Sequence, residues 1–226
     1  MSDEFQVGFL LFPRMTHLDL VGPAQVLSRV PGVRVHYVAR TLEPQPTDLG
    51  LSVLPTVAFT GCPPLDVVCV PGGPGVGDLL EDAETLEFLR RQGGRARFVA
   101  SVCTGALVLG AAGLIKGYRS ACHWLFRPYL ARFGAQADPG RVVRDRNRIS
   151  GAGVTAGIDF GLALAAELAG EETARMIQLA LEYDPQPPFR CGSPDQAGPE
   201  REARYRSFQQ GRLRALEEQI RRATQA

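Results

Sequence analysis

The fold of this chain is decided by residues 98–113, which read FVASVCTGALVLGAAG. Phe98–Val102 is apolar and partly β-branched, which predicts a buried strand. The small residues that follow Cys103 predict a helix, which Gly113 ends. The chain therefore passes from strand to helix at Cys103, and such a turn is the geometry of a nucleophile elbow.

An elbow of this kind gives Cys103 a chemical role. The turn lifts the reactive atom above the sheet, and the thiol lies at a helix N-terminus, where unpaired N–H groups favour the thiolate. The alternative is that Cys103 is a small buried residue, as many free cysteines are. The reactive interpretation is the one we favour.

Outside this stretch, predicted strands and helices alternate along the chain. The predicted strands are 6–12, 33–39, 66–71, 98–102, 119–122 and a hairpin within 141–150, with 49–59 as a further hairpin or edge segment. The predicted helices are 23–30, opened by Pro23, then 82–92, 106–112, 123–133, 158–168, 171–183 and 200–226. This alternation predicts an α/β fold, a flavodoxin-like parallel sheet with helices on both faces.

The last part of the chain differs in composition. Residues 184–199 are rich in proline, which predicts an arm rather than a helix. Residues 200–226 are charged, with a thin apolar stripe at Leu213, Leu216 and Ile220. We expect one domain over residues 1–199, followed by a helix over 200–226 that docks on it or on a partner subunit.

Charge and hydropathy limit the function classes. Lys and Arg together number 25 and Asp and Glu number 24, so charge gives no basis for binding nucleic acid or an anionic membrane. No apolar run approaches the length of a membrane span, and the acidic start leads directly into a strand, unlike a signal peptide. We expect a cytoplasmic protein.

The cysteines and histidines favour neither a disulfide framework nor a metal site. There are three histidines, too few for an expected zinc cluster, and the cysteines are odd in number and irregularly spaced. The cysteines are Cys62, Cys69, Cys103, Cys122 and Cys191.

Three chemically distinctive positions follow predicted strands. Asp19 follows the first strand, Gly73 lies in the glycine-rich loop after strand 66–71, and Cys103 ends strand 98–102. Ligands of parallel α/β sheets bind beyond the carboxyl ends of the strands. The sequence therefore predicts that these three positions meet in one crevice.

A thiolate needs a proton donor or acceptor beside it. His36 lies in a predicted strand, and His123 opens a predicted helix, where it is expected to support the loop; His17 stays open as a candidate. In cysteine amidases and proteases on similar folds, a histidine directly follows the cysteine. Here a threonine follows Cys103, so we favour the carboxylate of Asp19 as the partner. Adjacent anions repel, so we expect a protonated Asp19 beside a Cys103 thiolate.

Several motifs resemble those of one protein family. The chain resembles the ThiJ/PfpI branch of the class I glutamine amidotransferase-like superfamily, and within it the isocyanide hydratases, from Val7 to about Pro199. The motifs that carry the resemblance are LDLVGP, PPLDVVCVPGGPGVG, VCTGALVLGAAGL, SACHW, GVTAGID and LEYDPQPPFRCGSP.

The resemblance implies a reaction without metal or organic cofactor, in which water adds to an isocyanide, R–N≡C, and gives an N-substituted formamide. Cys103 would attack the carbon to form a thioimidate, and Asp19 would protonate it and then activate water. Thr104 would position Asp19 or the intermediate, and the amides of Gly73 and Val154 would hold the developing charge. The resemblance also implies a homodimer.

One position departs from the family pattern, because Ala152 stands where the pattern has a glycine. Its methyl group would restrict the nearby helix or the pocket. Two other functions stay open, a glyoxalase or deglycase and the sensor half of an AraC-type regulator. About 27 residues follow Pro199, too few for the DNA-binding domain of such a regulator.

Overall fold

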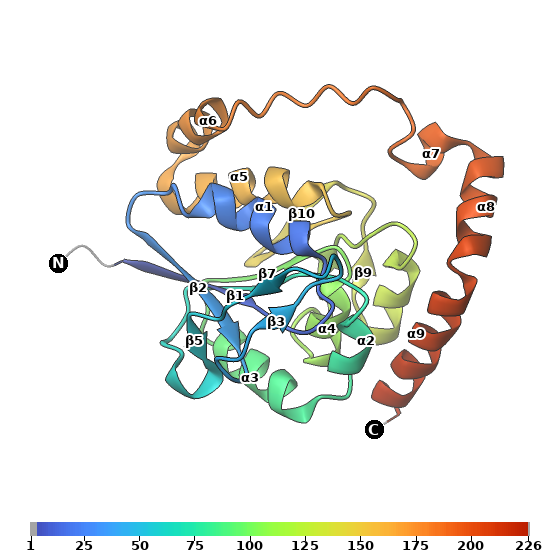
Figure 1. Ribbon diagram of the computed structural model, residues 1–226, viewed down its shortest axis with the longest axis horizontal. Coiled ribbons are helices and arrows are strands. Elements are labelled where there is room, and N and C mark those ends of the chain that lie inside the picture. Colours follow the sequence, from blue (N-terminus) through green and yellow to red (C-terminus); the bar gives the residue numbers. More distant parts are fainter. Residues whose placement is uncertain (1–3, 226) are drawn as a thin grey trace.

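The computed structural model describes residues 4–225 and is built on one seven-stranded sheet with helices on both faces (Figure 1). The strand order is β10-β11-β7-β6-β1-β2-β5, and every pairing is parallel except that of β10 with β11. The strands of this sheet are β1 Phe5–Leu10, β2 Val33–Ala39, β5 Val57–Ala58, β6 Val67–Val70, β7 Phe98–Val102, β10 Val142–Asp145 and β11 Arg148–Gly151. The run β2-β1-β6-β7-β11 has the flavodoxin-like order, as predicted.

Helices α1 and α5 pack together on one face of the sheet, and α3 and α4 cover the other (Figure 1). The helices are α1 His17–Leu27, α2 Val76–Leu79, α3 Ala83–Gly93, α4 Gly105–Ala111, α5 Ala156–Ala169, α6 Glu171–Ala180, α7 Pro194–Ala197, α8 Pro199–Phe208 and α9 Gln210–Ala223, with 3-10 turns at η1 Phe59–Gly61 and η2 Arg127–Phe133. Two small ladders pair β3 Gln45–Pro46 with β4 Ser52–Val53, and β8 Arg119–Ser120 with β9 Gln136–Ala137.

The centre of the sheet is fully buried, which explains its sequence. All residues of β6 and β7 are buried, as the uninterrupted apolar runs predicted. Strand β7 has the predicted bounds, α4 ends before Gly113, and Gly113 has a positive φ of 76° that suits glycine.

Two predicted helix boundaries are wrong. Helix α1 begins at His17 rather than at Pro23, which lies inside the helix, so Asp19 belongs to its first turn and not to a loop. The predicted helix 123–133 is a 3-10 helix that begins only at Arg127, and Gly134 ends it with a φ of 70°.

The C-terminal helix of the prediction is two helices, α8 and α9, which meet at Gln209. Leu216 and Ile220 of α9 are buried, and α9 packs beside α2 of its own chain. The predicted division at residue 199 stays a prediction, and its outer limits, residues 1 and 226, lie outside the described residues. Within residues 4–225, no helix is both long and apolar enough to cross a bilayer.

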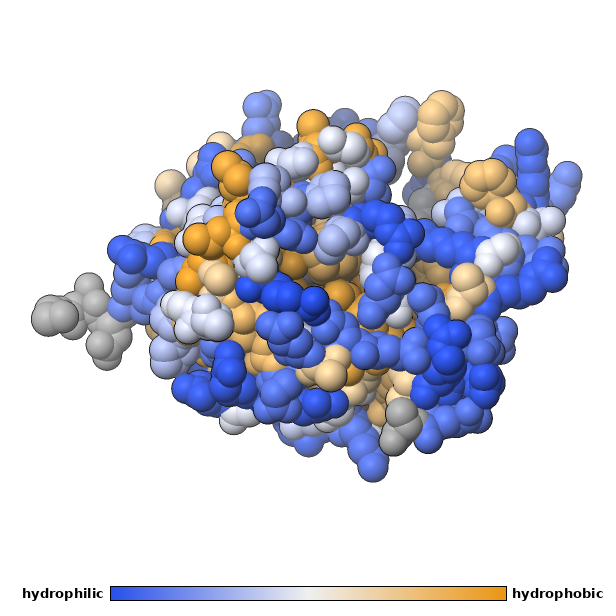
Figure 2. Space-filling model, turned by 60° about the horizontal axis from the view of Figure 1, so that its bottom comes forward, coloured by the Kyte–Doolittle hydropathy of each residue, from blue (hydrophilic) through white to orange (hydrophobic). Residues whose placement is uncertain are grey.

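Most of the surface in Figure 2 is hydrophilic, and hydrophobic residues reach that face in several smaller groups. Among residues 4–225, the exposed large hydrophobic residues fall in three parts of the chain: the segment around β3 and β4, helix α6 with the arm after it, and α8. They are Leu42, Leu49, Leu51, Leu54, Met176, Leu179, Phe189, Tyr205 and Phe208.

Candidate active site

Cys103 occupies the strained turn that the sequence predicted. It follows β7 directly and has a φ of 57°, a left-handed conformation that is costly for a residue with a side chain. Its N–H donates to the carbonyl oxygen of Gly151, 3.0 Å away. A Cβ on Gly105 would lie 2.0 Å from the Val70 carbonyl oxygen, so the turn requires glycine there. The tight turn thus holds the thiol above the sheet.

Asp19 is the acidic group of the site. Its side chain is completely buried, and Oδ2 accepts a hydrogen bond from the Gly72 N–H at 2.9 Å. Oδ1 has no hydrogen-bond partner of standard geometry in residues 4–225. The Cys103 thiol lies close enough to lower the pKa of this carboxyl as a hydrogen-bond donor. The structure therefore brings Asp19 and Cys103 together, as predicted.

The start of α1 places Asp19, and a distant residue fixes that start. Thr16 precedes the helix in an extended conformation, and its backbone N–H donates to the Gly72 carbonyl oxygen at 2.8 Å. Asp48 accepts hydrogen bonds from the His17 N–H at 3.1 Å and from Thr16 Oγ1 at 2.9 Å. A carboxylate at a helix N-terminus is favourable, so Asp48 caps α1 from another part of the chain.

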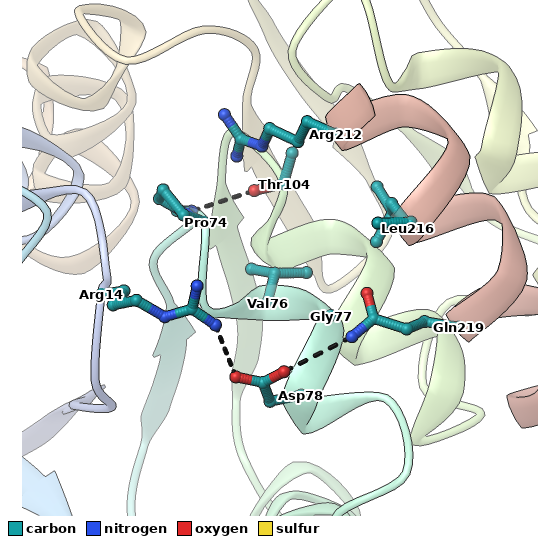
Figure 3. Close-up of a pocket in the computed structure, with 11 residues that line it drawn as sticks. Arg14, Pro74, Val76, Gly77, Asp78, Thr104, Arg212, Leu216 and Gln219 are labelled. Carbon is teal, nitrogen blue, oxygen red and sulfur yellow. Dashed lines mark hydrogen bonds and ion pairs between the residues drawn. The ribbon is translucent and has the colours of Figure 1, made fainter. Parts of the chain in front are cut away.

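The glycine loop after β6 joins Thr104 to Asp19. The Gly73 N–H donates to Thr104 Oγ1 at 3.0 Å, a bond drawn in Figure 3. A Cβ on Gly72 would lie 2.6 Å from the Thr104 nitrogen and 2.8 Å from Asp19 Oδ2. The Gly73 amide therefore contacts Thr104 in this structure, and its expected role in holding charge on the substrate stays a prediction. Val154 lines the same pocket as Cys103, and the role of its amide stays a prediction.

The pKa shifts of the pair follow the direction that the sequence predicted for Asp19 but not for Cys103. Burial raises the pKa of Asp19 to about 7, against the lowering effects of the Gly72 and Cys103 hydrogen bonds. Burial and the negative charge of Asp19 also raise the pKa of Cys103 well above its usual value, although the Thr104 N–H lowers it. The expected resting thiolate is therefore not supported, because the loss of hydration outweighs the helix N-terminus.

The three histidines have different positions. His36 lies on β2, and its Nε2 is 2.7 Å from Gln6 Oε1. His123 lines the Cys103 pocket, stacks near Trp124 and accepts a hydrogen bond from the Leu125 N–H at 3.3 Å, which confirms its supporting role. Burial lowers the pKa of His123 to about 4, so it is uncharged at neutral pH. His17 also lines the pocket, and its Nδ1 is buried without a partner in residues 4–225.

Cys103 opens into a pocket of about 830 Å³, including its open mouth. Its lining residues are Thr16, His17, Leu18, Asp48, Leu49, Gly73, Cys103, His123, Phe126, Val154, Tyr205 and Arg212. The sequence did not predict that Asp48, Tyr205 and Arg212 line this pocket. No local pattern links the β3–β4 segment, α8 or α9 to the turn at Cys103.

A second pocket shares Gly73 and Arg212 with the first, and Thr104 also lines it (Figure 3). It lies between the glycine loop, α2 and α9. Asp78 accepts hydrogen bonds there from Arg14 at 2.7 Å and from Gln219 at 3.4 Å. The bond from Gln219 links α9 to α2, and the bond from Arg14 links the loop before α1 to the same carboxylate.

Across residues 4–225, no three or more His, Cys, Asp or Glu side chains are grouped to hold a metal ion. All five cysteines are free thiols. Cys122 is fully buried and close enough to Cys103 to raise its pKa. The chemistry that the site can perform with its own residues is nucleophilic attack by sulfur, with proton transfer by Asp19.

Comparisons with known proteins give the relatives of this chain. The model of the DJ-1/PfpI family matches residues 6–167. An isonitrile hydratase of Pseudomonas putida is 55% identical over 192 residues, which are 85% of this chain and 84% of that protein. A ThiJ/PfpI family protein from Pseudomonas syringae has a crystal structure with a TM-score of 0.93 and 44% identity, covering 97% of this chain and 91% of that one.

The comparisons also include a regulator. The HTH-type transcriptional regulator GbdR of Pseudomonas aeruginosa is 30% identical over 187 residues. This match covers 79% of the chain but 50% of the regulator. The similarity to regulators was expected from the elbow region.

Proposed function

Because the chain belongs to the DJ-1/PfpI family, we propose that it is an isocyanide hydratase, an enzyme that converts an isocyanide and water into an N-substituted formamide. Isonitrile is another name for isocyanide, so the relative from Pseudomonas putida carries the name of this activity. The observation that carries the proposal is the Cys103 thiol on a strained elbow beside Asp19, a buried carboxyl whose pKa is about 7. Soft nucleophiles such as sulfur suit the electrophilic isocyanide carbon.

The first step joins sulfur to carbon. Asp19 as carboxylate accepts the thiol proton while Cys103 Sγ attacks the terminal carbon of R–N≡C. The same proton then passes from Asp19 to that carbon, which gives the thioimidate R–N=CH–S–Cys103. One thiol and one isocyanide are consumed, and Asp19 ends the step as a carboxylate.

The second step releases the product. The Asp19 carboxylate accepts a proton from water as the water oxygen attacks the thioimidate carbon, and passes this proton to the nitrogen, which gives the tetrahedral adduct R–NH–CH(OH)–S–Cys103. Asp19 then accepts the hydroxyl proton as the carbon–sulfur bond breaks, giving R–NH–CHO, and returns this proton to the sulfur. The buried position of Asp19 suits both proton transfers because its pKa lies near neutral pH.

Thr104 and the backbone amide of Val154 assist the reaction. The Gly73 N–H fixes Thr104 Oγ1, which leaves the hydroxyl proton of Thr104 free to donate beside Asp19. The Val154 amide, on the loop that opens α5, would donate to the adduct from the other side of the pocket.

We also propose that the enzyme is a cytoplasmic homodimer. Support for the dimer comes from apolar side chains that one copy leaves exposed on α6 and the arm after it, namely Met176, Leu179 and Phe189. The location stays a prediction.

Formamide production tests the proposed function. Purified protein is incubated with phenyl isocyanide, and N-phenylformamide is measured by chromatography against a blank without enzyme. We expect product from the wild type and none above the blank from Cys103→Ala, whose fold circular dichroism should show to be intact. Cys122→Ala is the matched control, since it removes a neighbouring buried thiol, and it should keep producing formamide.

The absence of formamide with the wild type would overturn the proposal. Turnover of an α-oxoaldehyde instead would identify a glyoxalase or deglycase. Binding of a small molecule without turnover would identify a sensor like the matched half of the regulator.

A further inference from the structure

The pocket around Cys103 has a cation on its wall that the reaction does not use. Arg212 belongs to the first turn of α9, outside the region that matches the family model. Its guanidinium lies over the Phe126 ring, 4.9 Å from the ring centroid, and it lines both the Cys103 pocket and the adjoining one. Figure 3 shows the side chain extending from α9 toward the strand–helix turn that contains Thr104.

Arg212 has no acidic partner within residues 4–225. Two other arginines of α9 are paired, Arg221 with Glu218 and Arg222 with Glu81. The stacking on Phe126 holds the Arg212 side chain in place but leaves its N–H groups able to bind an anion.

No ion pair joins Arg212 to another ionisable group of the pocket within residues 4–225. The Asp48 carboxylate lines the same pocket, and its two oxygens accept hydrogen bonds from Thr16 Oγ1 and the His17 N–H at the start of α1. His123 is uncharged at neutral pH, and Arg212 is one of the groups that keep its pKa low. Arg212 is therefore a cation of the pocket wall that no ion pair holds within residues 4–225.

Part of the pocket wall suits an apolar group. Leu18, Leu49, Phe126, Val154 and Tyr205 line the pocket together with Cys103 and Arg212. An isocyanide carbon at the sulfur would direct its R group along these side chains. A substituent at the far end of R would then reach the cation.

We propose that the preferred substrates are isocyanides whose R group carries a carboxylate, and that Arg212 binds this carboxylate. The inference rests on the proposed function and adds the substrate class. Arginine binds carboxylates through two parallel hydrogen bonds, which would fix the orientation of R as well as adding affinity. Since the carboxylate is remote from the reacting carbon, the preference should appear mainly in KM.

Matched substrate pairs test the proposal. The value of kcat/KM is measured for 4-isocyanobenzoate against 4-isocyanobenzamide, and for isocyanoacetate against isocyanoacetamide, so that each pair differs in charge and little in shape. For the wild type we expect the carboxylate to be preferred about three- to tenfold in at least one pair, and less at high salt.

The variants separate Arg212 from general charge effects. Arg212→Gln should bring the ratio of carboxylate to amide to about 1 or below, and Arg212→Lys should keep part of the preference. Arg214→Gln removes the same charge from an exposed position of α9 outside both pockets, so the ratio should stay as in the wild type.

Two results would overturn the inference: a wild-type ratio at or below 1 in both pairs, or a preference that survives Arg212→Gln. Failure of the proposed function is a different result, since then neither member of a pair would give a formamide.

Discussion

At the residue scale, Cys103 and Asp19 form one ionising unit. Both side chains are buried, and burial raises the pKa of each; the charge of Asp19 raises the pKa of Cys103 further, whereas the hydrogen bond from the thiol lowers the pKa of Asp19. Whether the single proton of the monoanion lies on sulfur or on oxygen is a property of the pair. The sequence could place the two residues together, but it could not show how strongly burial acts on the thiol. That effect depends on the packing around Cys103.

The pair predicts the pH dependence of the reaction. Below pH 7, Asp19 is protonated and cannot accept the thiol proton, because burial raises its pKa to about 7. We therefore expect kcat/KM to fall about tenfold per pH unit as the pH drops below that value, and to level off above it. Steady-state rates with phenyl isocyanide from pH 5 to 9 measure this profile.

Asp19→Asn is the control for the assignment. The amide still offers an oxygen to the Gly72 N–H but cannot take the thiol proton, so the rate should fall about 100-fold or more and the acidic limb should disappear. A flat wild-type profile, or a variant of near wild-type rate, would remove Asp19 from the mechanism.

At the element scale, the loop after β6 is packed too closely for any side chain at Gly72. A methyl group there would meet the Thr104 nitrogen at 2.6 Å and Asp19 Oδ2 at 2.8 Å. We expect Gly72→Ala to reduce kcat at least tenfold and to lower the free energy of unfolding by about 1–3 kcal/mol, because the atoms that must shift belong to the site. Urea unfolding and formamide assays give the two quantities.

Gly153→Ala is the matched control on the opposite loop. The nearest atom to its added Cβ would be His123 Cδ2 at 3.7 Å, an ordinary contact. Unfolding free energy should therefore change by less than about 0.5 kcal/mol. Equal effects of the two variants would show that the close packing at Gly72 is unimportant.

The helices and strands whose bounds were predicted best are those set by residues within or next to the element itself. The bounds of β2 and β7 follow from apolar and alternating patterns, and Gly170 separates α5 from α6 with a φ of 88°. The start of α1 was missed because its cause is distant. Pro23 is typical of a helix beginning, whereas the actual N-terminus depends on Asp48 in the β3–β4 segment.

At the scale of the whole molecule, the last helices complete the pocket. Leu216 and Ile220 gave the sequence a thin apolar stripe, and both are buried in the structure. The sequence could not predict the surface against which these two side chains pack. That surface includes Gly77 of α2, which lies against the flexible amide end of Gln219.

Exposed apolar side chains on α6 and the arm after it bear on how the whole molecule assembles. Between α6 and α7 the chain runs as an extended arm (Figure 1), on which Phe189 is 77% exposed, and Leu179 of α6 is 73% exposed. Exposed apolar side chains of this size favour burial against another surface, and a second copy presents the same side chains in a two-fold arrangement. We therefore expect a dimer of twice 24.5 kDa in light scattering after gel filtration at micromolar concentration.

Substitution on this face tests that the arm and α6 make the contact. Leu179→Glu together with Phe189→Glu should shift the mass to one chain, because two charges per copy would enter an apolar interface. Leu54→Glu, at a 66% exposed position between β4 and β5, is the matched control and should leave the dimer intact. A wild type that elutes as a single chain would contradict the dimer, and a dimer that withstands the double substitution would place the interface on another face of the molecule.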